Sequence, residues 1–370
     1  MKKLHIAMLI GSLTKGGAER VLVNLADYFV NKGYCVTMVT QYRLADEYAL
    51  NEKVRRVISD ITPEQTTGNR VINFARRFEK LRNIWKKERP DVILSFIGKN
   101  NMMAILTSRF LRIPVAVSVR ADPVEEYYSS WMRFMARHLF SRADGVILQT
   151  SGCFDFFPEG VRRKAVILKN PISGGFFRER YEGERDKTIV AVGRVDENKN
   201  HELLIRAFSG IAEEFPDYKL IIYGEGDLRQ RLGELVRELG LSDRVLLPGG
   251  IGNVADAIYK ARIFVLCSNS EGVPNTLIEA MLMGLTVVAT DCPCGGPADL
   301  IRSGYNGCLI PVKSIDKMKE KLQYLLNNLQ IADELGRNAV KTRDIYAAGK
   351  VYGEWESFLR SLAERPGKQL

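Results

Sequence analysis

Two glutamates, Glu271 and Glu279, stand eight positions apart in the stretch EGVPNTLIEAM. The apolar run RIFVLC before this stretch predicts a strand, and Pro274 is suited to the first turn of a helix. One carboxylate therefore precedes the predicted helix, and the other lies in its first turns. Such a pair could act as acid and base, or it could bind two parts of one ligand.

The start of the predicted helix favours binding over acid–base chemistry. Its first backbone amides have no partner within a helix, and the helix dipole adds to their attraction for an anion; they belong to Asn275, Thr276 and Leu277. A phosphate held there would bring Glu271 close to a sugar and Glu279 close to a ribose hydroxyl. For Glu279 alone, the alternative is an acid that merely stabilises the start of its own helix.

A second loop carries two cations. In VAVGRVDENKNHELL, residues 190–204, a strand is predicted to end at Gly193 and a helix to begin near 198–200. Arg194 and Lys199 lie between them, at the carboxyl end of the strand, where two cations suit a diphosphate. The alternative is that both side chains are simply solvated, which is common for bases in loops.

Glycines open a helix in the first half of the chain. In GSLTKGGAER, Gly16 and Gly17 would let the backbone approach a ligand closely. The stretch lacks the G-x-G-x-x-G spacing of dinucleotide sites and an acidic residue at the next strand end, which counts against a dehydrogenase.

No metal or cofactor is expected. The sequence contains no D-x-D, and its histidines, at positions 5, 138 and 201, are far in sequence from the C-x-C of Cys292 and Cys294. The six cysteines are scattered, which indicates reduced thiols and a cytoplasmic protein. The apolar N-terminal run is interrupted by His5 and predicts a first core strand rather than a signal peptide.

Short apolar runs alternate with helical stretches along all 370 residues, which predicts two doubly wound α/β domains with parallel sheets. The first domain is expected over residues 1–169 and the second over 171–348. A last helix, about 349–366, is expected to pack back on the first domain. Because ligands bind at the carboxyl ends of parallel strands, the expected site is a deep cleft between the domains.

Positive charge is concentrated in the first half. Residues 1–170 hold 28 of the 54 Lys and Arg but 16 of the 44 Asp and Glu, an excess of 12 positive charges. Two stretches, 70–90 and 127–142, interleave aromatic residues with bases. They predict contact with an anionic membrane surface, although each could also be an ordinary helix with solvated bases. No nucleic-acid recognition motif is present.

The motifs GGAERV, VAVGRVDENKN and EGVPNTLIEAMLMGLTVVATDCPCGGPADLI are together similar to the family 4 glycosyltransferases, which are retaining enzymes with the GT-B fold. The similarity runs nearly end to end, and the E-x7-E spacing of Glu271 and Glu279 is its most specific part. The resemblance implies transfer of a hexose-type sugar from a nucleotide diphosphate sugar, with uridine the expected base. The acceptor would be a glycan, such as a lipid-linked oligosaccharide or a surface-polysaccharide intermediate.

The resemblance also implies roles for single residues. Arg194 and Lys199 would hold the donor diphosphate, Glu271 would contact the donor sugar, and Glu279 would bind the ribose. The other donor-binding positions are Gly17, Arg120, Gly193, Gly272, Val273, Pro274, Asn275, Thr276 and Leu277. The first domain would bind the acceptor and the second the donor, on the inner face of the cell membrane.

One position departs from the family pattern. Many relatives carry a histidine in the loop after the fourth predicted strand, where VSVRADP places Arg120. Arg120 could bind a neutral sugar, pair with a uronic acid, or form a loop salt bridge with no role in binding.

Two other functions keep the same fold. A nucleotide-sugar epimerase would need a histidine among its site residues, and none of the three histidines is expected there. A non-catalytic subunit that binds nucleotide sugars would not need all of Arg194, Lys199, Glu271 and Glu279.

Overall fold

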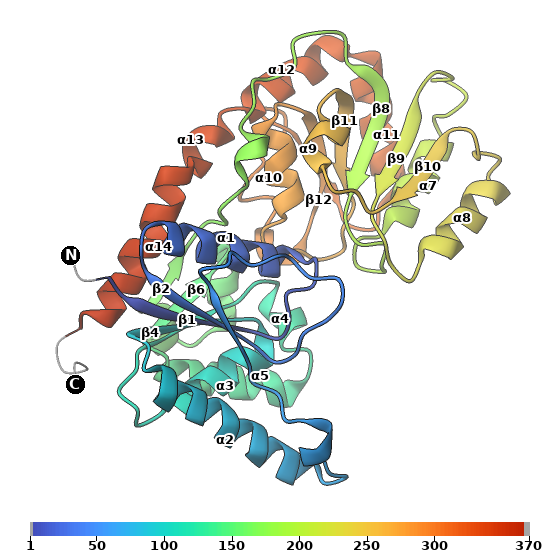
Figure 1. The fold of residues 1–370 in the computed structure, drawn as a ribbon. Helices are drawn as coiled ribbons and strands as arrows, with labels where there is room; N and C mark the ends of the chain where they lie inside the picture. Colours follow the sequence, from blue (N-terminus) through green and yellow to red (C-terminus); the bar gives the residue numbers. More distant parts are fainter. Residues whose placement is uncertain (1–2, 366–370) are drawn as a thin grey trace. The chain divides into compact units, whose positions relative to one another are not determined.

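The computed structural model describes residues 3–365. The chain forms two compact units (Figure 1). The first ends at Pro171 and resumes at Ala348, and the second is Ile172–Ala347. Each unit has a parallel sheet with helices on both faces, which confirms the predicted α/β class.

The first unit has a seven-stranded sheet in the order β3-β2-β1-β4-β5-β6-β7. Its central strands are fully buried, as strands covered on both faces must be. The strands are β1 His5–Ile10, β2 Cys35–Thr40, β3 Arg55–Ile58, β4 Val92–Phe96, β5 Val115–Ser118, β6 Gly145–Leu148 and β7 Ala165–Ile167. The weakly apolar β3 was not anticipated from the sequence, because its RRVI pattern belongs to a partly exposed edge strand.

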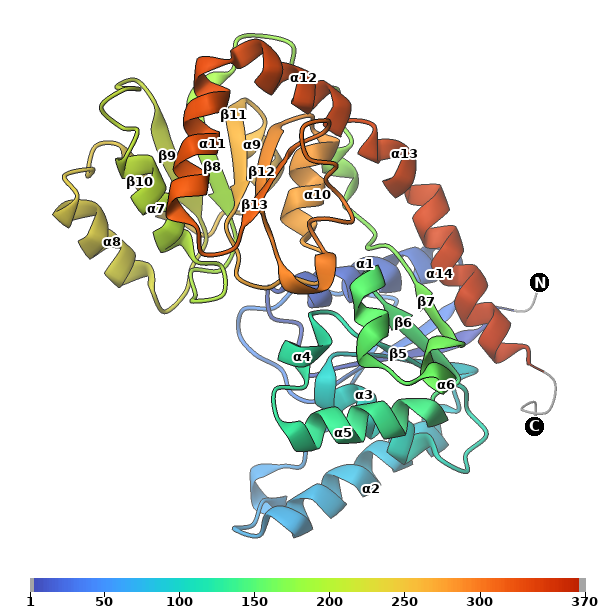
Figure 2. The same cartoon turned by 180° about the vertical axis from the view of Figure 1, so that it is seen from behind.

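Helices α1 and α14 cover one face of this sheet, and α2, α3 and α5 cover the other (Figures 1 and 2). The apolar stripe of α1 is buried, from Val21 to Phe29. The helices are α1 Gly17–Asn31, α2 Arg70–Glu88, α3 Gly98–Ser108, α4 Pro123–Glu126, α5 Ser130–Leu139, α6 Glu159–Arg162 and α14 Ala348–Ala363.

The second unit repeats the design with six parallel strands in the order β10-β9-β8-β11-β12-β13. The strands are β8 Asp186–Val192, β9 Lys219–Tyr223, β10 Val245–Gly249, β11 Ala261–Leu266, β12 Thr286–Asp291 and β13 Cys308–Pro311. The helices are α7 His201–Ser209, α8 Arg229–Glu238, α9 Val254–Ile258, α10 Asn275–Leu282, α11 Ile315–Asn327, α12 Leu329–Ala339 and α13 Thr342–Tyr346. Helices α7, α8 and α11 share one core with the sheet, and α9 and α10 share another.

Helix α14 belongs to the first unit although it comes last in the chain. It buries Val351, Trp355, Leu359 and Leu362 along one stripe, and the Trp355 indole donates to the Lys169 carbonyl at 2.8 Å. No helix in the described residues combines the length and the apolar character needed to cross a membrane.

Glu356 fastens α14 to the rest of the first unit. Its carboxylate accepts hydrogen bonds from Tyr28 and Lys32, each at 2.8 Å, and from Tyr34 at 2.5 Å. Burial works to raise the pKa of Glu356, but the bonds from Lys32 and the two tyrosines outweigh it and lower the pKa to about 2. The carboxylate therefore stabilises the folded unit in its ionised form.

We expect Glu356→Gln to destabilise the protein in a pH-dependent way. Because the folded pKa lies below the ordinary value of 4.5, the contribution is complete above pH 4.5 and is lost as pH falls toward 2. Urea unfolding of both proteins across this range should show a difference in free energy that shrinks with acidification. A difference independent of pH would mean that the charge of Glu356 contributes nothing.

Candidate functional site

Two loops meet at the centre of the second sheet. Strands β8 and β11 are hydrogen-bonded neighbours although β9 and β10 come between them in sequence. The chain therefore reverses its direction of winding between them, which is where such sheets bind ligands. The loop after β8 carries Gly193, Arg194 and Lys199, and the loop after β11 carries Glu271.

An ion pair joins the two loops. The Lys199 ammonium contacts the Glu271 carboxylate, and both side chains are largely buried, at 17% and 12% exposed. The Ser268 hydroxyl donates to the same carboxylate oxygen at 2.6 Å. Gly193 lies against the Lys199 side chain, since a Cβ at this glycine would come within 3.3 Å of it. The structure thus brings three of the predicted site residues together.

Asn198 joins the same loops through hydrogen bonds. Its amide donates to the Ser270 carbonyl at 2.9 Å and accepts from the Ser270 amide at 3.1 Å, while the Asn198 carbonyl accepts from the Asn269 amide at 2.7 Å. Sequence reasoning missed this residue. The sequence signal that could have indicated it is an asparagine next to Lys199 together with a second asparagine, Asn269, two positions before Glu271.

Asp196 shapes the loop that carries the two cations. Its carboxylate accepts from the Lys199 amide at 2.9 Å and from the Arg194 guanidinium at 2.9 Å. The Arg194 side chain is 67% exposed and so keeps most of its surface available to a ligand. Asp196 was also missed from the sequence, although an Asp three residues before a helical segment commonly makes such a turn.

His201 is the histidine that lies nearest to the predicted loop residues, against the backbone of Arg194. Its ring contacts the Arg194 carbonyl at 3.2 Å, and its other nitrogen lies 3.8 Å from the Cys267 sulfur. The side chain is buried, and burial together with the charge of Lys199 lowers the pKa of His201 to about 4. The imidazole is therefore neutral near pH 7 and supports the loop from behind.

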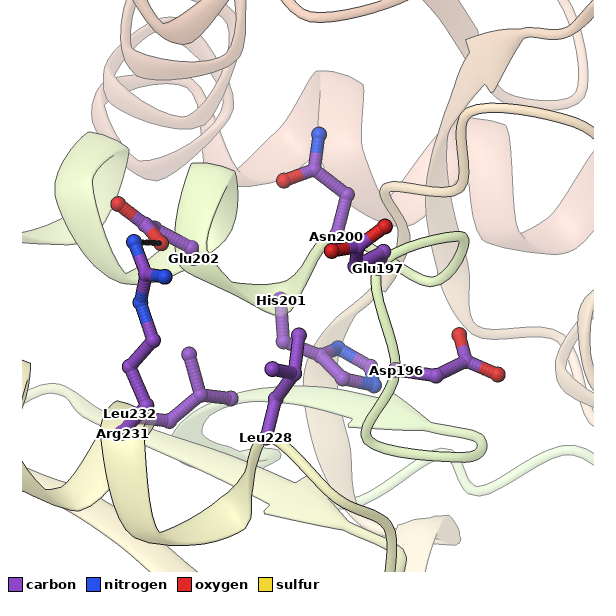
Figure 3. A pocket seen from close by; sticks show the side chains of 8 residues that line it. All are labelled: Asp196, Glu197, Asn200, His201, Glu202, Leu228, Arg231 and Leu232. Carbon is purple, nitrogen blue, oxygen red and sulfur yellow. Dashed lines mark ion pairs between the residues drawn. The ribbon is translucent and has the colours of Figure 1, made fainter.

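A pocket of about 190 Å³ opens on the α7–α8 side of this loop (Figure 3). Three carboxylates and one arginine line it together with His201, whereas Lys199 and Glu271 do not; the charged residues are Asp196, Glu197, Glu202 and Arg231. Its excess of negative charge is unsuited to a diphosphate. The pocket is therefore separate from the predicted donor-binding residues.

The start of α10 agrees with the prediction in part. The helix begins at Asn275 after Pro274, which supplies no side-chain cap. The prediction that the Leu277 amide has no hydrogen-bond partner in the helix is wrong, because that amide donates to the Pro274 carbonyl at 3.1 Å. Thr276 is partly exposed, whereas Glu279 is 1% exposed and faces the packed side of the helix. Its proposed contact with a ribose stays a prediction.

The turn before α10 is packed backbone against backbone. A Cβ at Gly296 would overlap the Gly272 carbonyl, so only a glycine fits there. Val273 is partly exposed and Pro274 is buried. The turn that carries these predicted donor-binding positions is thereby held against the chain beyond β12.

Two cysteines beside the loops, Cys267 and Cys292, are buried. Among residues 3–365, no three His, Cys, Asp or Glu side chains gather in a way that could hold a metal ion. Burial raises the pKa of the Cys267 thiol to about 12 and of the Cys292 thiol to about 11, so both stay protonated near pH 7.

Gly17 and Arg120 belong to the first unit. Gly17 begins α1, directly after strand β1 and its loop. The Arg120 guanidinium donates to Asn170 at 2.6 Å and lies 4.5 Å from the centre of the Phe96 ring. Burial lowers the pKa of Arg120 to about 9, and the charges of Glu126 and Glu19 oppose the shift. Arg120 therefore stays charged near pH 7.

The alternative of a loop salt bridge at Arg120 is wrong. Within the described part of the chain, no carboxylate lies at ion-pair distance from its guanidinium. Glu126 instead accepts from the backbone amides of Arg120 at 2.7 Å, Ala121 at 3.2 Å and Gly98 at 2.8 Å. It thereby fixes the backbone that presents Arg120, and it acts on the guanidinium only through its charge.

Comparison with known proteins agrees with this architecture. Residues 15–173 match the family model described as Glycosyltransferase Family 4, and residues 176–342 match the one described as Glycosyl transferases group 1. The matched segments fall in the two α/β units and together span most of the chain. The chain is therefore a glycosyltransferase of the GT-B type.

Curated relatives align over nearly the whole length. One is the "GalNAc-alpha-(1->4)-GalNAc-alpha-(1->3)-diNAcBac-PP-undecaprenol alpha-1,4-N-acetyl-D-galactosaminyltransferase" of Campylobacter jejuni, 26% identical over 98% of this chain and 99% of that protein. Another is the amylovoran biosynthesis glycosyltransferase AmsD of Erwinia amylovora, 24% identical over 97% of this chain and 100% of that protein. Such relatives act in the synthesis of polysaccharides and lipid-linked glycans.

Solved structures share the fold. HepE of Anabaena, in a crystal structure with UDP-glucose, superposes with a TM-score of 0.82 at 18% identity, over 97% of this chain and all of that one. The sucrose-phosphate synthase of Thermosynechococcus elongatus gives the same TM-score at 18% identity, over 97% of this chain and 99% of that one.

We expect Asn198→Ala to destabilise the second unit by about 1–3 kcal/mol, because it leaves backbone groups of Ser270 without their partners. Urea unfolding measures the loss. The matched control is Gln230→Ala, which removes an exposed amide bonded to Glu234 on α8. Equal stability of the two variants would show that Asn198 does not hold the loops together.

Proposed function

We propose that the protein is a retaining hexosyltransferase that moves a sugar from a nucleotide diphosphate sugar, with UDP as the carrier, to a glycan acceptor. The acceptor class we propose is a lipid-linked oligosaccharide or a surface-polysaccharide intermediate. The observation that carries this proposal is the joining of Lys199 to Glu271 across two loops at the centre of the second sheet. The names of the relatives, and the UDP-sugar held by HepE, are consistent with the donor and acceptor classes.

The second unit is proposed to bind the donor. Lys199 and the exposed Arg194 supply two cations for a diphosphate, and the first turn of α10 supplies backbone amides beside them. Glu271, which already accepts from Ser268 and Lys199, would accept from hydroxyls of the donor sugar. The remaining contacts, from Gly193, the 272–276 turn and Glu279, complete the proposed donor site.

These groups would act on the bond between the anomeric carbon and the diphosphate. Breaking this bond places negative charge on the departing phosphate, and preformed cations stabilise the charge as it develops. We propose attack from the same face, with the acceptor hydroxyl giving its proton to the departing phosphate oxygen as the new glycosidic bond forms. The configuration of the sugar is then retained. No metal is proposed to take part.

The first unit is proposed to bind the acceptor. Its Gly17 and the charged Arg120 would also approach the donor sugar. Arg120 would donate hydrogen bonds to neutral sugar hydroxyls or pair with a sugar carboxylate. A lipid-linked acceptor would bring the protein to the inner face of the cell membrane, and the basic first half of the sequence suits an anionic surface.

Two alternatives keep the fold and change the chemistry. A hydrolysing nucleotide-sugar epimerase would use a histidine as an acid or base, and His201 is buried with its pKa lowered to about 4, which disfavours proton transfer at neutral pH. A non-catalytic binding subunit is the other. Slow hydrolysis of the donor in the absence of acceptor would favour the transferase, because a binding subunit hydrolyses nothing.

Lys199→Ala and Glu271→Ala are each expected to lower sugar transfer by about 10²–10³-fold, because each removes a group proposed to hold the donor. Transfer is measured by the release of nucleoside diphosphate in the presence of acceptor, and folding by thermal unfolding. Lys187→Ala is the matched control, since Lys187 forms an exposed ion pair with Asp217 in the same unit. Turnover like that of the unsubstituted protein in either site variant would refute the assignment.

Nucleotide sugars of the correct class should raise the thermal unfolding temperature, because a ligand that binds only the folded state stabilises it. The screen compares UDP-linked with GDP-linked sugars, and neutral sugars with a uronic acid. Protection by UDP-sugars is expected and should be lost in Arg194→Ala. Protection by GDP-sugars alone would overturn the choice of uridine. Protection that depends on the uronic acid would give Arg120 a carboxylate partner.

A further inference from the structure

An exposed apolar surface lies on α4 and α5 of the first unit. It consists of Val124, Tyr128, Trp131 and Phe134, which are 42%, 66%, 67% and 52% exposed, and we call it the aromatic face. The rings of Trp131 and Phe134 stack at 5.9 Å, and the Phe134 ring lies 4.0 Å from that of His138. Positions 131, 134 and 138 fall on one side of a helix, so the rings form a row along the outside of α5.

The aromatic face is held in place from beneath. The Arg133 guanidinium donates to the Tyr127 carbonyl at 3.0 Å and to the Val124 carbonyl at 3.2 Å, which ties α5 to α4. The Ser129 hydroxyl caps α5 by accepting from the Met132 amide at 3.2 Å. These hydrogen bonds therefore fix the backbone that carries the exposed side chains.

The surroundings of the aromatic face are basic. Residues 130–142 contain three arginines and a histidine but no Asp or Glu, and Arg137 and Arg142 are exposed. Upstream, the Glu126 carboxylate is turned inward to accept from backbone amides, which leaves Glu125 as the exposed acid of α4.

The first turns of α2 add a second exposed apolar group. Val71, Ile72 and Phe74 are 75%, 42% and 51% exposed, and residues 70–89 contain eight Lys and Arg but two Asp and Glu. Helices α2 and α5 both pack against α3 in one outer layer, and both follow a strand at its carboxyl end (Figure 2). The two apolar groups therefore lie toward the same edge of the sheet, the edge at which Arg120 leaves β5.

We propose that the aromatic face and the start of α2 dock on an anionic phospholipid bilayer. Tryptophan and tyrosine settle at the level of lipid headgroups, and arginine pairs with their phosphates. A second copy of this chain fits poorly, because two such basic surfaces would repel each other. The proposal rests on the proposed transferase function and names the surface of the protein that would contact the membrane. Vesicle binding can be measured without any sugar transfer.

Trp131 provides a direct signal. The sequence has three tryptophans, and Trp85 and Trp355 are fully buried, so Trp131 alone should change its surroundings on docking. With phosphatidylcholine vesicles that contain phosphatidylglycerol, we expect tryptophan emission to shift to shorter wavelength. Vesicles of phosphatidylcholine alone should give no shift, and added salt should weaken the effect. Trp131→Phe should keep vesicle binding and lose the shift.

Removal of the rings should remove the binding. Trp131→Ser with Phe134→Ser should weaken cosedimentation with anionic vesicles by at least about tenfold, since two aromatic side chains no longer enter the bilayer surface. Arg137→Glu should weaken it as well. The control is Tyr324→Ser on α11 of the second unit, which removes an aromatic ring that is 46% exposed and lies beside Lys321. It should bind vesicles like the unsubstituted protein.

Two results would overturn the proposal. One is an absence of binding to anionic vesicles, or equal binding by the Tyr324→Ser control and by the double variant Trp131→Ser with Phe134→Ser, called the ring variant. The other is a lipid-free dimer, seen by sedimentation velocity, that the ring variant abolishes, because the surface would then join two copies of the chain. Protection by nucleotide sugars is measured separately on the same proteins, so failure of lipid binding is distinguished from failure of the transferase assignment.

Discussion

The pairing of Lys199 with Glu271 depends on the order of strands in the second sheet. The two residues are 72 positions apart, and they meet because β8 and β11 are parallel neighbours whose loops leave at the same edge. Parallel neighbours require crossover connections, so the intervening strands are placed on the far side of β8. A strand order that parted β8 from β11 would separate the two side chains, and with them the groups proposed to hold the two ends of one donor.

Glycines support these loops by allowing backbone to touch backbone. A side chain at Gly224 would overlap the Gly193 carbonyl, and one at Gly226 would overlap the Val195 carbonyl. The β9–α8 turn therefore packs directly behind the loop that carries Arg194, and the Gly193 amide donates to the Tyr223 carbonyl at 3.0 Å. Contacts of this kind, with Asn198 across the loops, position the charged groups before any ligand arrives. Preformed charge is what makes electrostatic stabilisation effective.

The sequence was sufficient for the fold class, most strands, and the loops that hold Lys199 and Glu271, because buried parallel strands and glycine turns leave strong local patterns. It was insufficient for contacts made by tertiary packing. The contact of the His201 ring with a carbonyl seven residues earlier is one example, because no periodic pattern marks it. The hydrogen bonds of Glu126 to backbone amides, rather than to the Arg120 guanidinium, are another example of a contact set by tertiary packing. The donor-binding roles themselves stay predictions, since only ligands can test them.

The two basic aromatic stretches show the same limit of pattern reasoning. Both have apolar residues at helical spacing among arginines, yet Trp85 is buried and donates to Thr107 at 2.8 Å, whereas Trp131 is 67% exposed. The difference is what lies beneath each residue. The second half of α2 packs on α3, which covers Trp85, but among residues 3–365 no further helix of the unit covers the outward side of α5. Helical periodicity identifies an apolar side but not its cover. Only the layer order of the fold distinguishes a core tryptophan from one available to a partner.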